Sequence, residues 1–109
     1  MLVELSIIPL GPEANWSDQL AEVLMLVDAS GLAYQLTPSG TCIEGNWDEV
    51  MTLVRRCHDR VRQSSARVVT TIKIEDEEGV NDQLTRNVIS VEEKVGRALR
   101  RSERQGVIK

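Results

Sequence analysis

The stretch from Tyr34 to Gly45, YQLTPSGTCIEG, constrains the fold of this chain more than any other. Two short β-prone runs meet at a four-residue turn, Thr37–Gly40. Proline at its second position already has the required φ, and glycine at its fourth tolerates the left-handed exit of a tight turn. The pattern therefore predicts a β-hairpin, whose two strands are neighbours in an antiparallel sheet.

The register of this hairpin decides which side chains face the core. A two-residue turn predicts an apolar face made of Leu32, Tyr34, Leu36, Thr41 and Ile43. The opposite, polar face then carries Gln35, Cys42 and Glu44, with Thr37 at its end. A glycine bulge at Gly40 would shift the register by one residue and move Glu44 across. We favour the unshifted register because it keeps the carboxylate out of the core.

A strand and a helix are predicted on each side of the hairpin. Residues 2–10 and 67–75 alternate between two faces, as strands do. The segments between strands carry apolar residues at helical spacing: Leu20, Val23, Leu24 and Val27 in the first, and Val50, Leu53, Val54, Cys57 and Val61 in the second. Asn15 or Ser17 is expected to cap the first helix, and Asn46 with Glu49 resembles a capping box for the second.

The resulting order is strand, helix, strand, strand, helix, strand. Two amphipathic helices can cover one face of a four-stranded antiparallel sheet, which predicts an α+β, ferredoxin-like β-α-β-β-α-β fold. The second sheet face is left without a cover. We therefore expect a homodimer or homotetramer that packs through its sheet faces.

Length and composition limit the alternatives. The 109 residues predict one domain, with a core over 1–75, a loop over 76–89 and an extra C-terminal helix over 90–105, where SVEE resembles another capping box. A net charge of −4 argues against a nucleic-acid partner. No apolar run approaches the ~20 residues of a membrane span, and the N-terminus lacks a signal-peptide pattern. We expect a cytoplasmic protein without a membrane partner, whose two cysteines are reduced.

Few residues indicate catalysis. The single histidine, His58, follows Cys57 on the second predicted helix, and adjacent helical residues point ~100° apart, which excludes a nucleophile pair. We interpret His58 as a surface residue. The acidic run 75–78 lacks the ligand spacing of a calcium loop and is expected to be solvated. The sequence thus predicts no catalytic residue, no metal site and no cofactor.

One polar constellation remains on the uncovered sheet face. Its members are Glu4, Ser6, Gln35, Thr37, Glu44, Thr71 and Lys73, and apolar Ile8 and Val69 bound it. These side chains could satisfy one another in a polar oligomer interface. Alternatively, they could form a pocket that hydrogen-bonds a small polar ligand. The residue pattern alone leaves both readings open.

The segments SIIPLG, GLAYQLTPSGTCIEG, NWDEVMTLVRRCHDRV, RVVTTIKI and SVEEKV follow one another in an order that resembles the thiamine-binding-protein-like family of the YkoF type, here as a single-domain member. The resemblance extends to about Arg97. It implies a ferredoxin-like fold, homo-oligomers built through the sheets, and binding of thiamine or its hydroxymethylpyrimidine moiety without established catalysis. The chain departs from the family at Cys42, where an aliphatic residue is usual, in the acidic run, and in its longer basic tail.

The resemblance also implies a set of ligand-binding residues: Ser6, Thr37, Glu44, Thr70 and Thr71. A carboxylate suits an aminopyrimidine, because it accepts from the exocyclic amine and can share a proton with a ring nitrogen. Two other functions stay open. One is a structural or partner-binding oligomer with no small ligand, and the other is a cofactor-free dimeric enzyme, which would need acid or base groups between sheet and helices.

Overall fold

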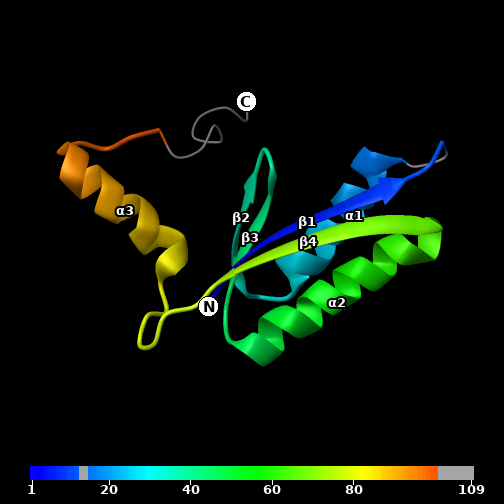
Figure 1. The fold of residues 1–109 in the computed structure, drawn as a ribbon, viewed down its shortest axis with the longest axis horizontal. Coiled ribbons are helices and arrows are strands. Elements are labelled where there is room, and N and C mark those ends of the chain that lie inside the picture. The colour runs from blue at the N-terminus through cyan, green and yellow to red at the C-terminus, as the bar shows by residue number, and fades with distance from the viewer. Residues whose placement is uncertain (13–14, 101–109) are drawn as a thin grey trace.

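The computed structural model describes residues 1–12 and 15–100. Four strands form one antiparallel sheet in the order β2-β3-β1-β4: β1 (Leu2–Leu10), β2 (Ala33–Thr37), β3 (Gly40–Glu44) and β4 (Arg67–Glu75). Three helices complete the described chain: α1 (Trp16–Ala29), α2 (Trp47–Ser64) and α3 (Gln83–Val95). This is the predicted ferredoxin-like arrangement with an additional helix (Figure 1). No helix in the described part of the chain is long and apolar enough to cross a membrane.

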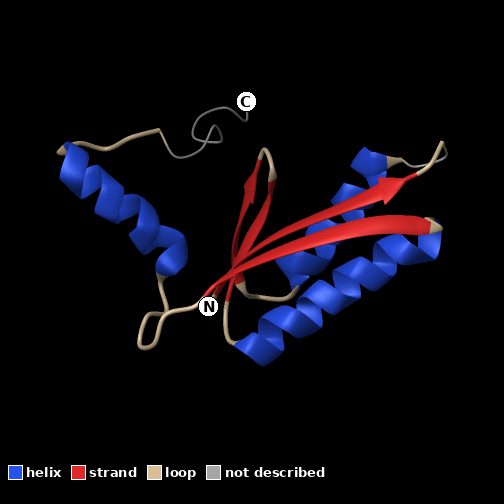
Figure 2. Cartoon of the chain, in the orientation of Figure 1, coloured by secondary structure: helices blue, strands red, loops and turns tan. Residues whose placement is uncertain are grey.

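Helices α1 and α2 lie together on one face of the sheet, whereas α3 projects away from it (Figure 2). The core between helices and sheet is aliphatic, because the chain has no phenylalanine and both tryptophans are exposed. Both predicted stripes face it: Val50, Leu53, Val54, Cys57 and Val61 are buried on α2, and Val23 and Val27 on α1. The strands contribute Val3, Leu5, Ile7 and Ile43.

The hairpin has the unshifted register. Thr37 pairs with Gly40 across the two-residue turn, and Gln35 pairs with Cys42. The reason for glycine at position 40 differs from the prediction, since only Gly11, Gly31, Gly79 and Gly96 have a positive φ among the described glycines. A Cβ on Gly40 would instead lie 2.9 Å from the carbonyl oxygen of Leu5. Gly40 therefore permits close approach of β3 to β1.

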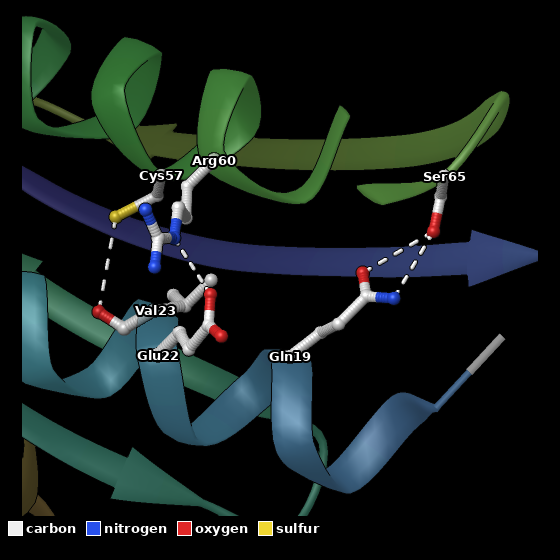
Figure 3. Close-up of polar contacts among 6 residues, drawn as sticks. All are labelled: Gln19, Glu22, Val23, Cys57, Arg60 and Ser65. Atoms are coloured by element: carbon white, nitrogen blue, oxygen red, sulfur yellow. Dashed lines mark hydrogen bonds and ion pairs between the residues drawn. The ribbon is translucent and has the colours of Figure 1, made fainter. Parts of the chain in front are cut away.

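Polar contacts join α1 to α2 on the covered side of the sheet (Figure 3). The buried Gln19 donates from Nε2 to Ser65 Oγ at 3.1 Å, and Ser65 donates back to Gln19 Oε1 at 3.3 Å. Arg60 Nε lies 2.6 Å from Glu22 Oε2. The Sγ of Cys57 lies 4.0 Å from the carbonyl oxygen of Val23. These contacts fix the two helices to each other and leave the opposite sheet face untouched.

Local signals place the first two helix starts correctly. Asn15 accepts from the Asp18 N–H at 3.3 Å, and Asn46 accepts from the Glu49 N–H at 2.8 Å. Each cap satisfies a backbone donor that has no partner within its own helix.

An extra C-terminal helix is present as predicted, but its bounds were predicted wrongly. The sequence suggested a loop over 76–89 and a helix over 90–105, whereas α3 runs from Gln83 to Val95 and ends at Gly96, with φ +89°. Ser90, the expected cap, lies within the helix, and residues 101–105 lie outside the described part of the chain. Asp82 at the true start makes no side-chain cap. The missing cap comes from elsewhere in the chain, as described below.

Candidate functional site

The uncovered sheet face carries a straight row of polar side chains across all four strands. Gln35 on β2 pairs with Cys42 on β3, Cys42 pairs with Glu4 on β1, and Glu4 pairs with Lys73 on β4. Glu4, Gln35 and Lys73 belong to the polar constellation predicted from the sequence, and Cys42 was predicted on the same face of the hairpin. The sheet register therefore brings a carboxylate, a thiol, an amide and an ammonium group onto one surface.

The charges of this row act on the thiol at its centre. Burial raises the pKa of the half-buried Cys42 thiol, the nearby carboxylate of Glu4 raises it further, and the ammonium of Lys73 opposes the change. The Cys42 thiol is thus predominantly protonated at neutral pH and can act as a weak hydrogen-bond donor.

Further along β1, the cross-strand pairs on the open face change from polar to apolar. Ser6 is half-buried on β1 and pairs with the exposed Thr71 of β4. Beyond them Ile8 pairs with Val69, and these side chains are 42% and 45% exposed. One end of the open face is therefore an uncovered apolar patch, bordered by two hydroxyl groups.

Thr37, one of the predicted site residues, forms a hydrogen bond within the hairpin turn. Its hydroxyl donates to the carbonyl oxygen of Gly40 at 2.9 Å and closes the hairpin turn. The hydroxyl oxygen can still accept a hydrogen bond from a ligand.

Glu44 caps the third helix. Its Oε2 accepts from the backbone N–H of Gln83 at 2.5 Å and from that of Leu84 at 3.3 Å. A carboxylate at a helix N-terminus is stabilised both by these charge-assisted hydrogen bonds and by the helix dipole. The predicted ligand carboxylate is thus already bound to α3 in this structure.

The first turn of α3 covers one end of the open face. Leu2 pairs with Glu44 on one side and Glu75 on the other, and Gln83 contacts both of these carboxylates. Gln83 is 1% exposed and donates from Nε2 to Glu75 Oε2 at 3.4 Å, while Asn87 donates to the same carboxylate at 3.1 Å. Gln83 and Asn87 were not predicted as functional residues from the sequence. Their four-residue spacing was the available signal, because it places them on one helix face.

Thr70 lies on the other side of the sheet. It pairs with the core-facing Ile7, and its Oγ1 lies 2.6 Å from Nδ1 of His58, with which it shares a hydrogen bond. The structure therefore brings Ser6, Thr37, Glu44 and Thr71 to the open face and does not bring Thr70 there. His58, expected as a plain surface residue, is half-buried and links α2 to β4.

Two hollows border this arrangement. A cavity of about 220 Å³ lies at the start of β3, where β1 extends beyond the hairpin, and its lining includes Ser6, Ile8, Trp16 and Leu36. A second, of about 450 Å³, lies between the start of α2 and residues 76–81. Within residues 1–12 and 15–100, no group of three or more His, Cys, Asp or Glu side chains is arranged to hold a metal ion.

The family assignment follows from the chain as a whole. A family model described as "Thiamine-binding protein" matches residues 3–92, which include all of the sheet except Leu2 and most of α3. The chain belongs to this thiamine-binding protein family. The resemblance inferred from the sequence motifs is thereby confirmed.

Related proteins agree with the assignment. The UPF0045 protein Mb1933 of Mycobacterium bovis is 37% identical over 93 residues, which cover 84% of this chain and 91% of that protein. A UPF0045 protein of Methanothermobacter thermautotrophicus is 35% identical over 84% of this chain and 96% of its own length.

Solved structures have the same fold. MJ1052 of Methanocaldococcus jannaschii superposes with a TM-score of 0.77 at 27% identity, over 84% of this chain and 95% of that one. TM0486 of Thermotoga maritima has a TM-score of 0.71 at 20% identity, over 83% of this chain and 96% of that one, which supports the fold alone.

Proposed function

We propose that this protein binds thiamine or its hydroxymethylpyrimidine moiety on the open sheet face, without catalysis, as a homo-oligomer. The observation that carries the proposal is the uncovered face itself, on which polar rows adjoin an exposed apolar patch. A small-molecule site needs this combination, because apolar surface supplies affinity while a few polar groups fix the orientation. The face lies within the segment that matches the thiamine-binding family.

Two carboxylates could accept the exocyclic amine of the pyrimidine. Glu4 stands in the middle of the polar row and is half-buried. Glu44 is one strand away, and a ligand would compete there with the N–H groups of α3. Ser6 and Thr71 form the adjoining hydroxyl pair, and Thr37 offers an acceptor at the hairpin end. Thr70, which the family resemblance also implies, lies on the helix side of β4 and would not contact a ligand on the open face.

A second copy is needed to enclose the ligand. The cavity of about 220 Å³ beside Ser6 and Ile8 is smaller than typical ligand pockets of roughly 300–1,000 Å³. Covering the apolar end of the face would close this space on its open-face side and remove Ile8 and Val69 from water. The sites of all copies in the oligomer would be equivalent by symmetry.

The chemistry of the face supports the proposal of binding without catalysis. The polar row contains the carboxylate of Glu4 and the ammonium group of Lys73. The description of the family, however, names a ligand and no reaction. The half-buried His58, the only histidine, hydrogen-bonds Thr70 on the opposite side of the sheet.

Titration calorimetry with thiamine and with hydroxymethylpyrimidine tests this proposal. We expect micromolar or tighter binding, and Thr71→Val should weaken it by about 1 kcal/mol because one neutral hydrogen bond is lost. Glu4→Gln and Glu44→Gln separate the two carboxylates: the one that binds the amine should lose roughly 1.5–3 kcal/mol, the scale of a charge-assisted bond.

Thr70→Val is the matched control. It removes the same hydroxyl from the neighbouring residue of β4, but on the helix side. Equal losses in Thr70→Val and Thr71→Val would argue against a site on the open face. If the parent protein binds neither compound, the family ligand does not apply to this chain, and a structural oligomer becomes the better description.

A further inference from the structure

The inner strand β1 has an unpaired edge over its second half. Its pairing with β3 ends at Leu5, opposite Thr41, whereas its pairing with β4 continues to Leu10. Figure 1 shows β1 running on past the point where the β2–β3 hairpin turns away from it. In the described sheet, the backbone of residues 6–10 therefore has a neighbouring strand on one side only.

Ile7 turns its backbone N–H and C=O toward this unpaired edge. The Gly45 N–H donates to the carbonyl oxygen of Met1, so these two residues form a hydrogen-bonded pair at the start of β1. Hydrogen-bonded pairs recur at every second residue of an antiparallel ladder, and both backbone groups of such a residue point the same way. The odd-numbered residues of β1 thus direct their backbone groups to the side of β3, and Ile7 is the first of them beyond the pairing.

Neither group has a backbone partner on this side. Within residues 1–12 and 15–100, neither bonds to the backbone of a turn or loop, although Ile7 is only 9% exposed. Buried backbone donors and acceptors are nearly always paired with protein, water or a ligand. The next residue of the same parity is Pro9, which has no N–H and is tolerated where no strand pairs with it. The edge beside Ile7 therefore has a donor and an acceptor ready for another molecule.

The cavity of about 220 Å³ lies against this edge. Its lining includes Ile7 itself, the hydroxyl-bearing Ser6, residues 38–40 of the hairpin turn, and two apolar walls, Trp16 and Leu36. Pockets for drug-sized ligands measure roughly 300–1,000 Å³, so this smaller space suits a single ring. A flat ring that enters it meets an indole and the paired donor and acceptor of one strand residue.

We propose that this cavity binds an aminopyrimidine ring through the backbone of Ile7. The ring nitrogen beside the exocyclic amine accepts from the Ile7 N–H, and the amine donates to the Ile7 carbonyl oxygen. The ring thus takes the place of a neighbouring strand along this edge. The indole of Trp16 offers an aromatic surface on which the ring stacks. This inference rests on the proposed function, because the ligands proposed there contain this ring.

The contact also decides which end of thiamine enters the cavity. The aminopyrimidine fills the space beside Ile7, and the thiazolium end extends past Ser6 toward the open face. The amine has two N–H groups, so one of them stays available to a side-chain acceptor. A pyrimidine without the amine loses the bond to the Ile7 carbonyl oxygen and leaves that acceptor unpaired.

Hydrogen exchange followed by NMR tests the contact in the full chain. In the free protein, the Ile7 amide should exchange at least about tenfold faster than that of Leu5, which faces β3. Hydroxymethylpyrimidine at saturation should slow the Ile7 amide at least about tenfold, because a hydrogen-bonded amide must open before it exchanges. Tyr34 is the matched control: its amide lies on the outer edge of β2, outside the cavity lining, and should not slow.

Calorimetry on two tryptophan variants tests the cavity wall. Trp16→Leu should weaken the binding of hydroxymethylpyrimidine by roughly five- to 100-fold, the scale of stacking between a base and an aromatic side chain. Trp47→Leu is the matched control, since Trp47 is 55% exposed against 54% for Trp16 and lies outside this cavity. A ligand held by the open face alone would not respond to Trp16, which reaches the cavity from α1.

The outcomes separate this inference from the proposed function. If the parent protein binds by calorimetry, unchanged exchange at Ile7 or equal affinities of the two tryptophan variants would overturn the inference and leave the proposed function standing. An Ile7 amide as slow as that of Leu5 in the free protein would also overturn it, because the edge would then be paired. If the parent binds neither thiamine nor hydroxymethylpyrimidine, both proposals fail together.

Discussion

At the scale of single residues, Cys42 reports on the charges of the open face. Its thiol lies beside Glu4, with Lys73 on the far side of that carboxylate, and both affect its pKa. Cysteine reactivity depends on the thiolate fraction, so the alkylation rate measures these charges directly.

We expect Glu4→Gln to lower the pKa of Cys42 and speed its reaction with iodoacetamide at mildly alkaline pH. Lys73→Gln should raise that pKa and slow the reaction. Each change in rate should be roughly two- to fivefold, because the thiolate fraction sets the rate of alkylation. Mass spectrometry of the modified peptides measures both rates. Cys57 serves as the internal control, because it is buried and should stay unmodified. Identical alkylation rates of Cys42 in the parent protein and both variants would contradict the placement of Glu4 and Lys73 in one row with Cys42.

Cys57 predicts a specific alkaline loss of stability. Burial raises the pKa of its thiol from 9.0 to about 11. Below pH 9 both folded and unfolded states hold the proton, but between pH 9 and about 11 the unfolded chain releases it first, so stability falls as pH rises.

Cys57→Ser has no group that titrates in this range. At neutral pH it should be less stable by about 1–3 kcal/mol, because a hydroxyl replaces the thiol in an apolar core. Its deficit should shrink by about 1–2 kcal/mol as pH approaches 11. Urea denaturation of both proteins at each pH measures the difference, in which other titrating groups cancel. A constant deficit would show that Cys57 titrates normally in the folded protein.

At the scale of elements, α3 depends on a residue from the central hairpin. Glu44 satisfies two backbone donors at the helix start, and Glu75 holds Gln83 and Asn87 on the same side. Helix α3 has 13 residues and few tertiary contacts, a length at which an isolated helix is marginal in water.

Glu44→Ala should therefore loosen the start of α3. Amide exchange at Gln83 and Leu84 should accelerate by roughly 10- to 100-fold, corresponding to about 1.5–3 kcal/mol for charge-assisted hydrogen bonds. Asp82→Ala is the control, since Asp82 makes no side-chain cap. Hydrogen exchange followed by mass spectrometry compares the two variants. Unchanged exchange in Glu44→Ala would mean that α3 is held by other contacts.

At the scale of the whole molecule, the sheet has one covered and one open face. The two helices that pack on the covered face bury an aliphatic core, and the open face ends in exposed Ile8 and Val69. A chain of 12.2 kDa that leaves such a patch in water is expected to cover it by self-association.

Ile8→Glu should reduce the proposed oligomer without harming the core, since the side chain is already partly exposed. The charge would have to enter the apolar contact between copies, which is unfavourable. Met25→Glu, on the exposed side of α1, should leave the assembly unchanged. Light scattering after size exclusion gives the mass of each variant. A parent protein that runs as a monomer, or an Ile8→Glu variant of unchanged mass, would contradict association through this face.

Local sequence patterns determined most of this fold. Alternation placed β1 and β4 at their observed bounds, and the turn Thr37–Gly40 set the hairpin register. The apolar stripe from Val50 to Val61 predicted the buried side of α2 completely. These features could be predicted because each depends on residues within one element or one turn, where backbone geometry fixes the direction of every side chain.

Only the tertiary structure decided which hydrogen-bond partners the polar side chains have. Glu44 caps a helix that begins 39 residues later, so the residues around Gln83 did not show which side chain caps α3. Thr70 and His58 are 12 residues apart on different elements, and only the packing of α2 against β4 brings them together. A hydrogen bond between distant residues depends on where whole elements lie. The periodicity within an element does not determine how that element packs against others. The partners of Glu44, Thr70 and His58 could therefore be identified only from the tertiary structure.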